Sequence, residues 1–382
     1  MTAVVWPFPP RDEMIEELNW VTDVIPAKSA EQRIALRSAP RRIFQFAHTM
    51  NDFMYSHACA VMREAQGGDG LLVPDWGQNT FLGVISPGSA VPISADLSIV
   101  DFGDAALLWE SLIKFETVTL TTDSNGTTID TVSNTYTAAR LLPLWPADAP
   151  EGIINSRGGA RINQVSVAMV VADNRDLSVT PAVAYRSLDV LDACPVIASG
   201  ELGEGFGWPV SAFDNPVGIP KYIRQRAIPN QSYSMRWHLF TRAEQFALRG
   251  WLHYRRGRQK AFWMSSRGQD LEPAANISGV TVRVFAFPGL TGLGRTDPFD
   301  IEIKTAATSY YRRVSAATAG PTTDGRATIN MTIDSSATVT IADIERISFL
   351  RCTRLDSDRV ELLHQAAGGM SVQVPMLEIP TP

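Results

Sequence analysis

The feature that most constrains the fold of this chain is an internal duplication. Two segments carry the same residue types at one constant spacing, which is larger than the period of a solenoid repeat. The matched pairs, all 193 positions apart, are Gln32-Arg33 with Gln225-Arg226, Phe44 with Trp237, and Phe53 with Phe246. We therefore expect two related domains in tandem.

Each copy is predicted to contain one amphipathic helix. Apolar residues recur at the three-and-four spacing that buries one helical stripe. These positions are Phe46, Met50, Phe53, Met54, Ala58 and Val61 in the first copy, and Leu239, Ala243, Phe246, Ala247, Trp251 and Tyr254 in the second.

A strand and a polar turn are expected after each helix. The match resumes there at an offset of 191, aligning Leu71, Leu72, Gly77 and Gln78 with Phe262, Trp263, Gly268 and Gln269. A weaker match pairs Gln164-Val165 with Gln373-Val374. Both dipeptides lie in period-two apolar runs that predict closing strands.

Composition limits the class of protein. The chain has 382 residues, 45% of them hydrophobic, which is enough for two domains with cores. A net charge of −6 gives no general attraction to nucleic acid. No apolar run of about 18 residues occurs, so no membrane insertion is expected.

We predict a mainly β (α+β) fold of two tandem antiparallel β-sandwich-like domains, each with one main amphipathic helix. The first domain, residues 1–205, includes an N-terminal arm and a projecting hairpin centred on Asp123-Ser124-Asn125-Gly126, where Asn-Gly favours a tight turn. The second domain is residues 206–382, because a Gly- and Pro-rich segment separates the copies.

No catalytic, metal or cofactor site is predicted. The sequence lacks Gly-x-Ser-x-Gly and His-Glu-x-x-His motifs, and its three cysteines have no paired spacing. Asp356 and Asp358 are two residues apart in a short polar stretch, which is more typical of a turn than of an acid-base pair. Gly289–Arg295 lacks the Gly-Lys-Ser/Thr ending of a phosphate loop.

The segment Phe246–Trp263 resembles the helix-then-strand core of distal tail proteins of long-tailed bacteriophages and gene transfer agents. In that family an aromatic-bearing helix runs into an Arg-Gly-Arg-like turn, an aromatic strand and a polar turn. Arg256-Gly257-Arg258 and Ser265–Asp270 occupy these places. The first copy departs from the pattern, with Gln66–Gly70 in place of the basic turn.

The resemblance implies a structural virion protein of a siphovirus tail tip or baseplate, assembled in the host bacterial cytoplasm, and not an enzyme. Such a protein forms a homo-oligomeric ring that connects the tail tube protein to the tail hub and to receptor-binding or fibre proteins. The tape measure protein and then DNA pass through its channel. Three duplicated chains would give a trimeric pseudo-hexamer, and the alternative is a hexamer with two layers.

Arginines are the candidate interface residues, because a guanidinium matches a carboxylate through two hydrogen bonds. The basic residues form two clusters, Arg37, Arg41 and Arg42, and Arg255, Arg256, Arg258 and Lys260. The alternative for the second cluster, which follows a predicted helix, is a solvated helix end, where cations interact favourably with the helix dipole. The candidates are Arg33, Arg41, Arg42, Arg226, Arg255, Arg256 and Arg258.

Two other functions remain open at this stage. The nine tryptophans allow a carbohydrate-binding adhesion protein of the tail tip, because an exposed ring can stack on a sugar, although cores and interfaces use most such residues. A hydrolase of the bacterial envelope is the third hypothesis.

Overall fold

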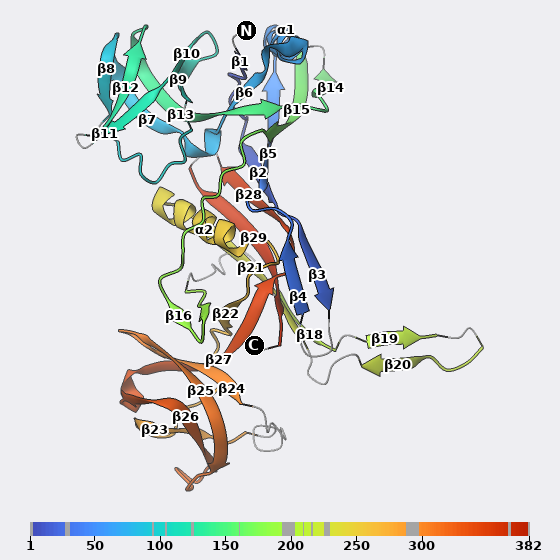
Figure 1. Ribbon diagram of the computed structural model, residues 1–382, viewed down its shortest axis with the longest axis vertical. Helices are drawn as coiled ribbons and strands as arrows, with labels where there is room; N and C mark the ends of the chain where they lie inside the picture. Colours follow the sequence, from blue (N-terminus) through green and yellow to red (C-terminus); the bar gives the residue numbers. More distant parts are fainter. Residues whose placement is uncertain are drawn as a thin grey trace.

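Figure 1 shows the computed structural model of the protein, which is built mostly of β-strands. It describes residues 3–26, 31–93, 95–103, 105–123, 126–159, 161–192, 203–208, 210–214, 217–224, 230–287, 298–365 and 368–380. In this part of the chain there are two α-helices, α1 (Asp52–Glu64) and α2 (Arg242–Arg255). The prediction of a mainly β fold is confirmed.

The first half of the chain builds a strand-helix-strand unit and a lobe. The unit begins with β1 (Val4–Val5), β2 (Glu13–Asn19), a hairpin of β3 (Thr22–Pro26) and β4 (Glu31–Ala35), β5 (Arg41–Met50), α1, a π-helical turn (Ala65–Asp69), β6 (Leu71–Pro74) and a 3₁₀ turn (Trp76–Gln78). The lobe contains β7 (Thr80–Ile85), β8 (Gly88–Ile93), β9 (Ala105–Ser111), β10 (Lys114–Val118), β11 (Leu120–Asp123) and β12 (Gly126–Val132). The unit closes with β13 (Tyr136–Asp148), β14 (Ile153–Gly159) and β15 (Ile162–Val171).

The second half follows the same plan after the short strands β16 (Ala184–Tyr185) and β17 (Leu188–Asp189). Its unit begins with β18 (Gly203–Gly207), a hairpin of β19 (Val210–Phe213) and β20 (Lys221–Arg224), β21 (Asn230–Leu239), α2 and β22 (Phe262–Ser265). Its lobe contains β23 (Ile277–Phe285), β24 (Phe299–Thr305), β25 (Ser309–Ala319) and β26 (Thr328–Val339). It closes with a 3₁₀ turn (Ile341–Asp343), β27 (Ile344–Leu355), β28 (Arg359–Gln365) and β29 (Met370–Glu378).

The strands of the two units are paired in the same order. In the first half, β5 pairs with β2 and β15, β15 pairs with β14 and β13, and β13 pairs with β6. In the second half, β21 pairs with β18 and β29, β29 pairs with β28 and β27, and β27 pairs with β22. All of these pairs are antiparallel.

The strand pairing also shows which residues of the two halves correspond to each other. Met50 and Leu239 end the strands before the two helices, and they pair with Asn163 and Met370. Equating these positions aligns β15 with β29 at an offset of 207. Three identical buried residues then coincide: Val165 with Val372, Val167 with Val374, and Met169 with Met376.

The strand pairing therefore aligns Gln164-Val165 with Ser371-Val372. The predicted match with Gln373-Val374 is wrong by two residues. Both dipeptides do lie on strands, β15 and β29, as expected. A shift of two residues keeps every side chain on the same face of a strand, so alternation alone does not reveal the error. The repeated Val-x-Val-x-Met pattern is the signal that fixes the register.

The predicted helix of the first copy starts too early. Residues 41–50 form β5, in which Phe44, Phe46, His48 and Met50 point into the core. Phe46 and Met50 are four residues apart, which suits a strand of period two as well as a helix of period 3.6. The helix begins only after Asn51, whose side chain accepts a hydrogen bond from Met54 N at 2.9 Å.

The predicted helix register is also wrong, by one helical turn. The two N-caps are Asn51 and Thr241, which are 190 positions apart (241 − 51) and not 193. With this offset the buried residues coincide: Ala58 with Leu248, Val61 with Trp251, and Met62 with Leu252. A shift of three residues leaves an apolar stripe almost in place, so periodicity is a poor guide to helix register.

Other local predictions are confirmed. β6 and β22 begin at the aligned residues Leu71 and Phe262. The expected hairpin is present, because Asp123 pairs with Gly126 between β11 and β12. The predicted domain boundary, between residues 205 and 206, falls inside β18 and would divide that strand, and the division into two domains stays a prediction.

One continuous sheet runs through both units. Its strand order is β14, β15, β5, β2, β28, β29, β21 and β18, so the halves lie side by side and meet where β2 pairs with β28 (Figure 1). One face of this sheet is apolar, and each helix adds its buried stripe to the core of its own half. The two lobes lie toward opposite ends of the molecule (Figure 1).

Candidate functional site at the junction of the two halves

The junction is an antiparallel ladder between strands from opposite ends of the sequence. β2 and β28 pair along seven residues each, from Glu13 opposite Gln365 to Asn19 opposite Arg359. The ladder satisfies the backbone groups of both strands. It also aligns Leu18 with Val360, and both side chains are buried in the core that α2 covers.

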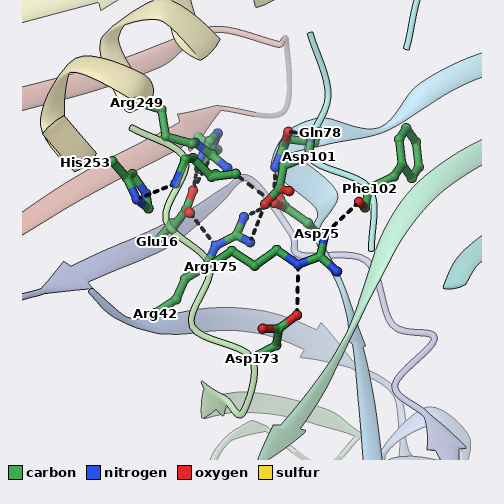
Figure 2. A network of polar contacts seen from close by, with 12 residues as sticks. Glu16, Arg42, Asp75, Gln78, Asp101, Phe102, Asp173, Arg175, Arg249 and His253 are labelled. Carbon is green, nitrogen blue, oxygen red and sulfur yellow. Dashed lines mark hydrogen bonds and ion pairs between the residues drawn. The ribbon is translucent and has the colours of Figure 1, made fainter. Parts of the chain in front are cut away.

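Glu16 lies at the centre of the junction (Figure 2). It is completely buried. Its carboxylate accepts hydrogen bonds from Arg42 on β5 and from Arg249 on α2, both at 2.6 Å. The Nε2 atom of His364 on β28 lies 2.8 Å from the same carboxylate. Side chains from both halves therefore converge on one acid.

Arg42 extends this network toward the lobe of the first half (Figure 2). Its guanidinium contacts Asp75 at 2.5 Å and Asp101 at 3.4 Å, and it lies over the rings of Phe44 and Trp145. We call Glu16, Arg42, Asp75, Asp101, Arg249 and His364 the junction cluster. It contains no exposed side chain.

The charges in the junction cluster shift one another's pKa values. Burial, the largest influence on Glu16, raises its pKa, but Arg249 and Arg42 overcome it and hold that pKa well below the usual range. Burial also lowers the pKa of nearby His253 to about 3, assisted by Arg249 and Arg42. Glu16 is therefore ionised and His253 neutral over the physiological pH range.

The arrangement is suited to holding elements together. Paired charges buried without access to water are costly to separate, because removing one partner leaves the other uncompensated. All six residues of the cluster are buried, with Glu16 and Asp75 0% exposed, and their charged groups contact one another. Within the described residues no group of three or more His, Cys, Asp or Glu side chains is arranged to hold a metal ion.

A second contact between the halves uses the β3–β4 hairpin, which lies on the second half. Glu31 of this hairpin contacts Arg354 at 2.7 Å, and Thr22 Oγ1 donates a hydrogen bond to Asp358 at 2.8 Å. Arg258 contacts Asp358 at 3.3 Å and donates to the carbonyl oxygen of Thr22 at 3.1 Å. The hairpin of the first half is thus fixed to the β27–β28 turn of the second.

Gly257, in the Arg-Gly-Arg turn after α2, permits this contact. Its φ angle is +63°, in the left-handed region. A Cβ atom there would fall on Asp358 Oδ1 and would lie 3.0 Å from Trp20 Cβ. The turn therefore needs glycine for its conformation and for the close approach of the two halves.

The structure brings several of the candidate interface arginines into contacts within one chain. Arg42 and Arg255 are buried, Arg41 is exposed on β5, and Arg226 lies outside the described residues. The remaining three are half-buried and form ion pairs: Arg33 with Glu31 at 3.7 Å, Arg256 with Asp176 at 3.1 Å, and Arg258 with Asp358 at 3.3 Å. An intersubunit role for these residues stays a prediction.

Arg255 is fully buried, so it is not a solvated helix end. It contacts Asp189 at 2.6 Å and donates a hydrogen bond to the carbonyl oxygen of Ala261 at 3.1 Å. Its guanidinium lies 5.3 Å from the ring centroids of both Trp251 and Phe262. Asp356 and Asp358 form ion pairs with Arg354 and Arg258 at the turn before β28, as expected for a structural turn.

Sequence reasoning missed Glu16, Asp75 and Arg249. Glu16 is 233 residues from Arg249 and 348 residues from His364, and no short motif contains any two of the three. The only local signal is the position of Glu16 between Met14 and Leu18, two apolar residues on the same face of the strand. It indicates a buried charge without naming its partners.

The face of the central sheet opposite the helices carries polar side chains among half-buried aliphatic ones such as Ile15, Ile43 and Leu363. Hydrogen bonds link its side chains from strand to strand, including Thr49 to Gln164 at 3.1 Å and Arg236 to Gln373 at 2.9 Å. We call this surface the open face. Its exposed charges include both signs, since Glu13 and Glu361 are acidic and Arg236 and Arg359 are basic, and Arg359 contacts Glu361 at 2.7 Å.

No model of a known protein family matches this sequence, and no curated protein matches it either. Neither helix in the described part of the chain is long and apolar enough to cross a membrane.

Proposed function

We propose that this chain is a ring-forming structural protein of a phage tail tip, of the distal tail type, and that it acts by assembly and not by catalysis. The observation that carries this proposal is the β2–β28 ladder, which joins two units of the same strand order edge to edge in one sheet. A sheet that already continues from one unit to the next is the element from which a closed wall is built.

The two units are versions of one ancestral β-sandwich-like fold, copied in tandem. Support comes from the identical order of strand pairing and from the coincidence of buried residues when the ladders are aligned. Val165, Val167 and Met169 match Val372, Val374 and Met376, and the buried helix positions match at one offset of 190. Chance similarity would not preserve connectivity, register and buried positions together.

The side-by-side arrangement favours a ring of three chains over six chains stacked in two layers. Because both units belong to the same sheet, each chain fills two neighbouring positions of a ring. Three chains then present six equivalent positions. Such a ring matches a six-fold tail tube on one side and a three-fold hub on the other.

The open face lines the channel in this proposal. Its neutral polar groups and mixed charges remain hydrated, and they offer DNA no run of basic residues to bind. The tape measure protein and DNA can therefore pass without strong attachment. The two lobes face away from the central sheet and would contact the tail tube, the hub and the receptor-binding proteins of the virion.

Electron microscopy of the purified full-length chain tests the proposal. We expect class averages of a ring with a central channel and six similar units. Particles that remain single chains at every concentration, or that form filaments, would exclude a ring-forming role. Measuring turnover on cell-wall fractions would separate this role from that of an envelope hydrolase, because we expect no activity above background.

A further inference from the structure

Within the chain, the two units are joined edge to edge through β28 and β2. β28 pairs with β29 on one side and with β2 on the other, and β2 also pairs with β5. Their counterparts are β14 in the first unit and β18 in the second. Among the described strands, β14 pairs only with β15 and β18 pairs only with β21, so each has one unpaired edge.

We propose that β14 of one copy pairs antiparallel with β18 of the next copy, in the way that β28 pairs with β2. This inference rests on the proposed function, because it assigns the two edges through which the ring closes. An unpaired strand edge presents backbone donors and acceptors that another chain can satisfy. Two different edges make a head-to-tail contact, which closes a ring when the rotation between copies fits.

The ladders determine which residues meet on the β18 side. Arg42 on β5 pairs with Leu18 on β2. The counterpart of Arg42 on β21 is Gln231, which pairs with Phe206 on β18. Phe206 therefore corresponds to Leu18. Two residues earlier, Glu204 takes the place of Glu16.

The same comparison applies to β14. Asn155 pairs with Val165 as Leu362 pairs with Val372, so Asn155 takes the place of Leu362. Ile153 then corresponds to Val360, and Arg157 corresponds to His364. Because Val360 lies opposite Leu18, the inferred register sets Ile153 opposite Phe206 of the next copy.

Exposure of these residues supports the pairing. Phe206 is 66% exposed, whereas Leu18, in the same place of the first unit, is 0% exposed. Ile153 is half-buried where Val360 is buried. A large apolar side chain that is exposed to solvent where the corresponding residue is buried in the core indicates that a partner covers it.

Charge supports the same contact. In the β2–β28 ladder, His364 contacts Glu16 diagonally across the two strands, at 2.8 Å. At the contact between copies the corresponding residues are Arg157 and Glu204, both exposed in a single chain. They are opposite in charge, so the diagonal contact becomes an ion pair.

The β19–β20 hairpin provides a third element of the interface. Its counterpart, the β3–β4 hairpin, is fixed to the β27–β28 turn through Arg354 and Asp358. The equivalent turn of the first unit, between β13 and β14, carries exposed Asp148 and Glu151. The β19–β20 hairpin projects from the molecule (Figure 1) and carries exposed Lys221 and Arg224, which would meet these acids on the next copy.

A charge swap tests the inferred contact. Arg157→Glu and Glu204→Arg are each made in the full-length chain, together with the double variant and a matched control. The control is Arg161→Glu, which reverses an exposed charge in the turn after β14, away from the proposed ladder. Mass photometry over a dilution series measures the concentration at which half of the chain is assembled.

Each single change is expected to raise this half-assembly concentration by at least about tenfold, because it places like charges across the contact. The double variant should return to near the wild-type value, since every copy then supplies the reversed pair. The control should match the wild type. All three charges are exposed, so circular dichroism should show unchanged folding.

The outcomes separate the inference from the function it rests on. If the wild type forms rings and the single variants assemble equally well, the edge assignment is wrong and the ring function stands. If the double variant is as weak as the single variants, Arg157 and Glu204 do not face each other, and the inference fails again. A wild-type chain that never assembles overturns the proposed function as well.

Discussion

Arg249 on α2 donates a hydrogen bond to Glu16 on β2 across 2.6 Å, although 233 residues separate them in the sequence. The two side chains belong to different units, and both are buried. This contact fastens the helix of the second half to a strand of the first. The rigidity of the junction therefore depends on a charge pair inaccessible to water.

Replacing Arg249 is expected to destabilise the protein strongly. Arg249→Ala leaves the buried Glu16 with one guanidinium fewer, which should lower the free energy of unfolding by about 3 to 5 kcal/mol. Urea denaturation followed by tryptophan fluorescence measures the change. Arg236→Ala on the open face is the control and should stay within about 0.5 kcal/mol of the wild type. Equal losses of unfolding free energy for the two variants would show that the junction cluster does not stabilise the contact between the halves.

Stability should fall as the pH is lowered below 6.5. Burial depresses the pKa of His253 to about 3 and that of His48 to about 4 in the folded protein, against an ordinary histidine pKa of about 6.5. Between these values the unfolded chain binds more protons than the folded one. Each histidine then removes up to about 1.4 kcal/mol of stability per pH unit.

The pH dependence is measured by urea denaturation between pH 7 and pH 5. His253→Gln should reduce the slope, and the double variant His48→Gln/His253→Gln should reduce it further. Below pH 4.5 the depressed pKa of Glu16 adds a loss in the same direction, since its charged form stabilises only the folded state. A slope that both substitutions leave unchanged would contradict the assignment of neutral buried histidines.

Trp251→Ala is expected to cost about 3 to 5 kcal/mol of folding free energy, because it opens a cavity between α2 and the sheet. The Trp251 ring packs against Phe262, with the ring centroids 5.2 Å apart, and only 9% of the residue is exposed. Phe53→Ala, on α1 and 73% exposed, is the matched aromatic control. An unfolding midpoint in urea that does not change for Trp251→Ala would refute this packing.

Gly257→Ala should be more damaging than Gly325→Ala. Both glycines have left-handed φ angles, +63° and +73°, so both substitutions carry the conformational cost of about 1 to 2 kcal/mol. Only at Gly257 would the new Cβ meet Asp358 and Trp20, whereas Gly325 has open space. Comparing the two unfolding free energies isolates the crowding of this turn against Asp358 and Trp20. Equal losses would mean that the turn is not packed against Asp358.

Features set by neighbouring residues could be predicted from the sequence. The Asp123–Gly126 hairpin, the strands beginning at Leu71 and Phe262, and the placement of Trp251 in a core all follow from turn chemistry and apolar patterning. The positions that went wrong are those where two registers satisfy the same periodicity. The helix offset was wrong by three residues and the β15–β29 offset by two, each of which keeps the buried side inward.

The candidate site was beyond prediction for a different reason. Glu16, Arg42 and Asp75 come from separate elements of the first half and Arg249 from the second, and the energy of a buried charge depends on partners that chain order does not reveal. The predicted basic clusters did include Arg42 and Arg255. Their burial came from tertiary packing and not from a pattern in the sequence.

The most direct test of the central claim, that one chain fills two equivalent positions of a ring, combines native mass spectrometry with electron microscopy of the same sample. We predict a mass of three chains and class averages with six similar units around a channel. A mass of six chains with two stacked layers, or a two-fold dimer, would contradict the account.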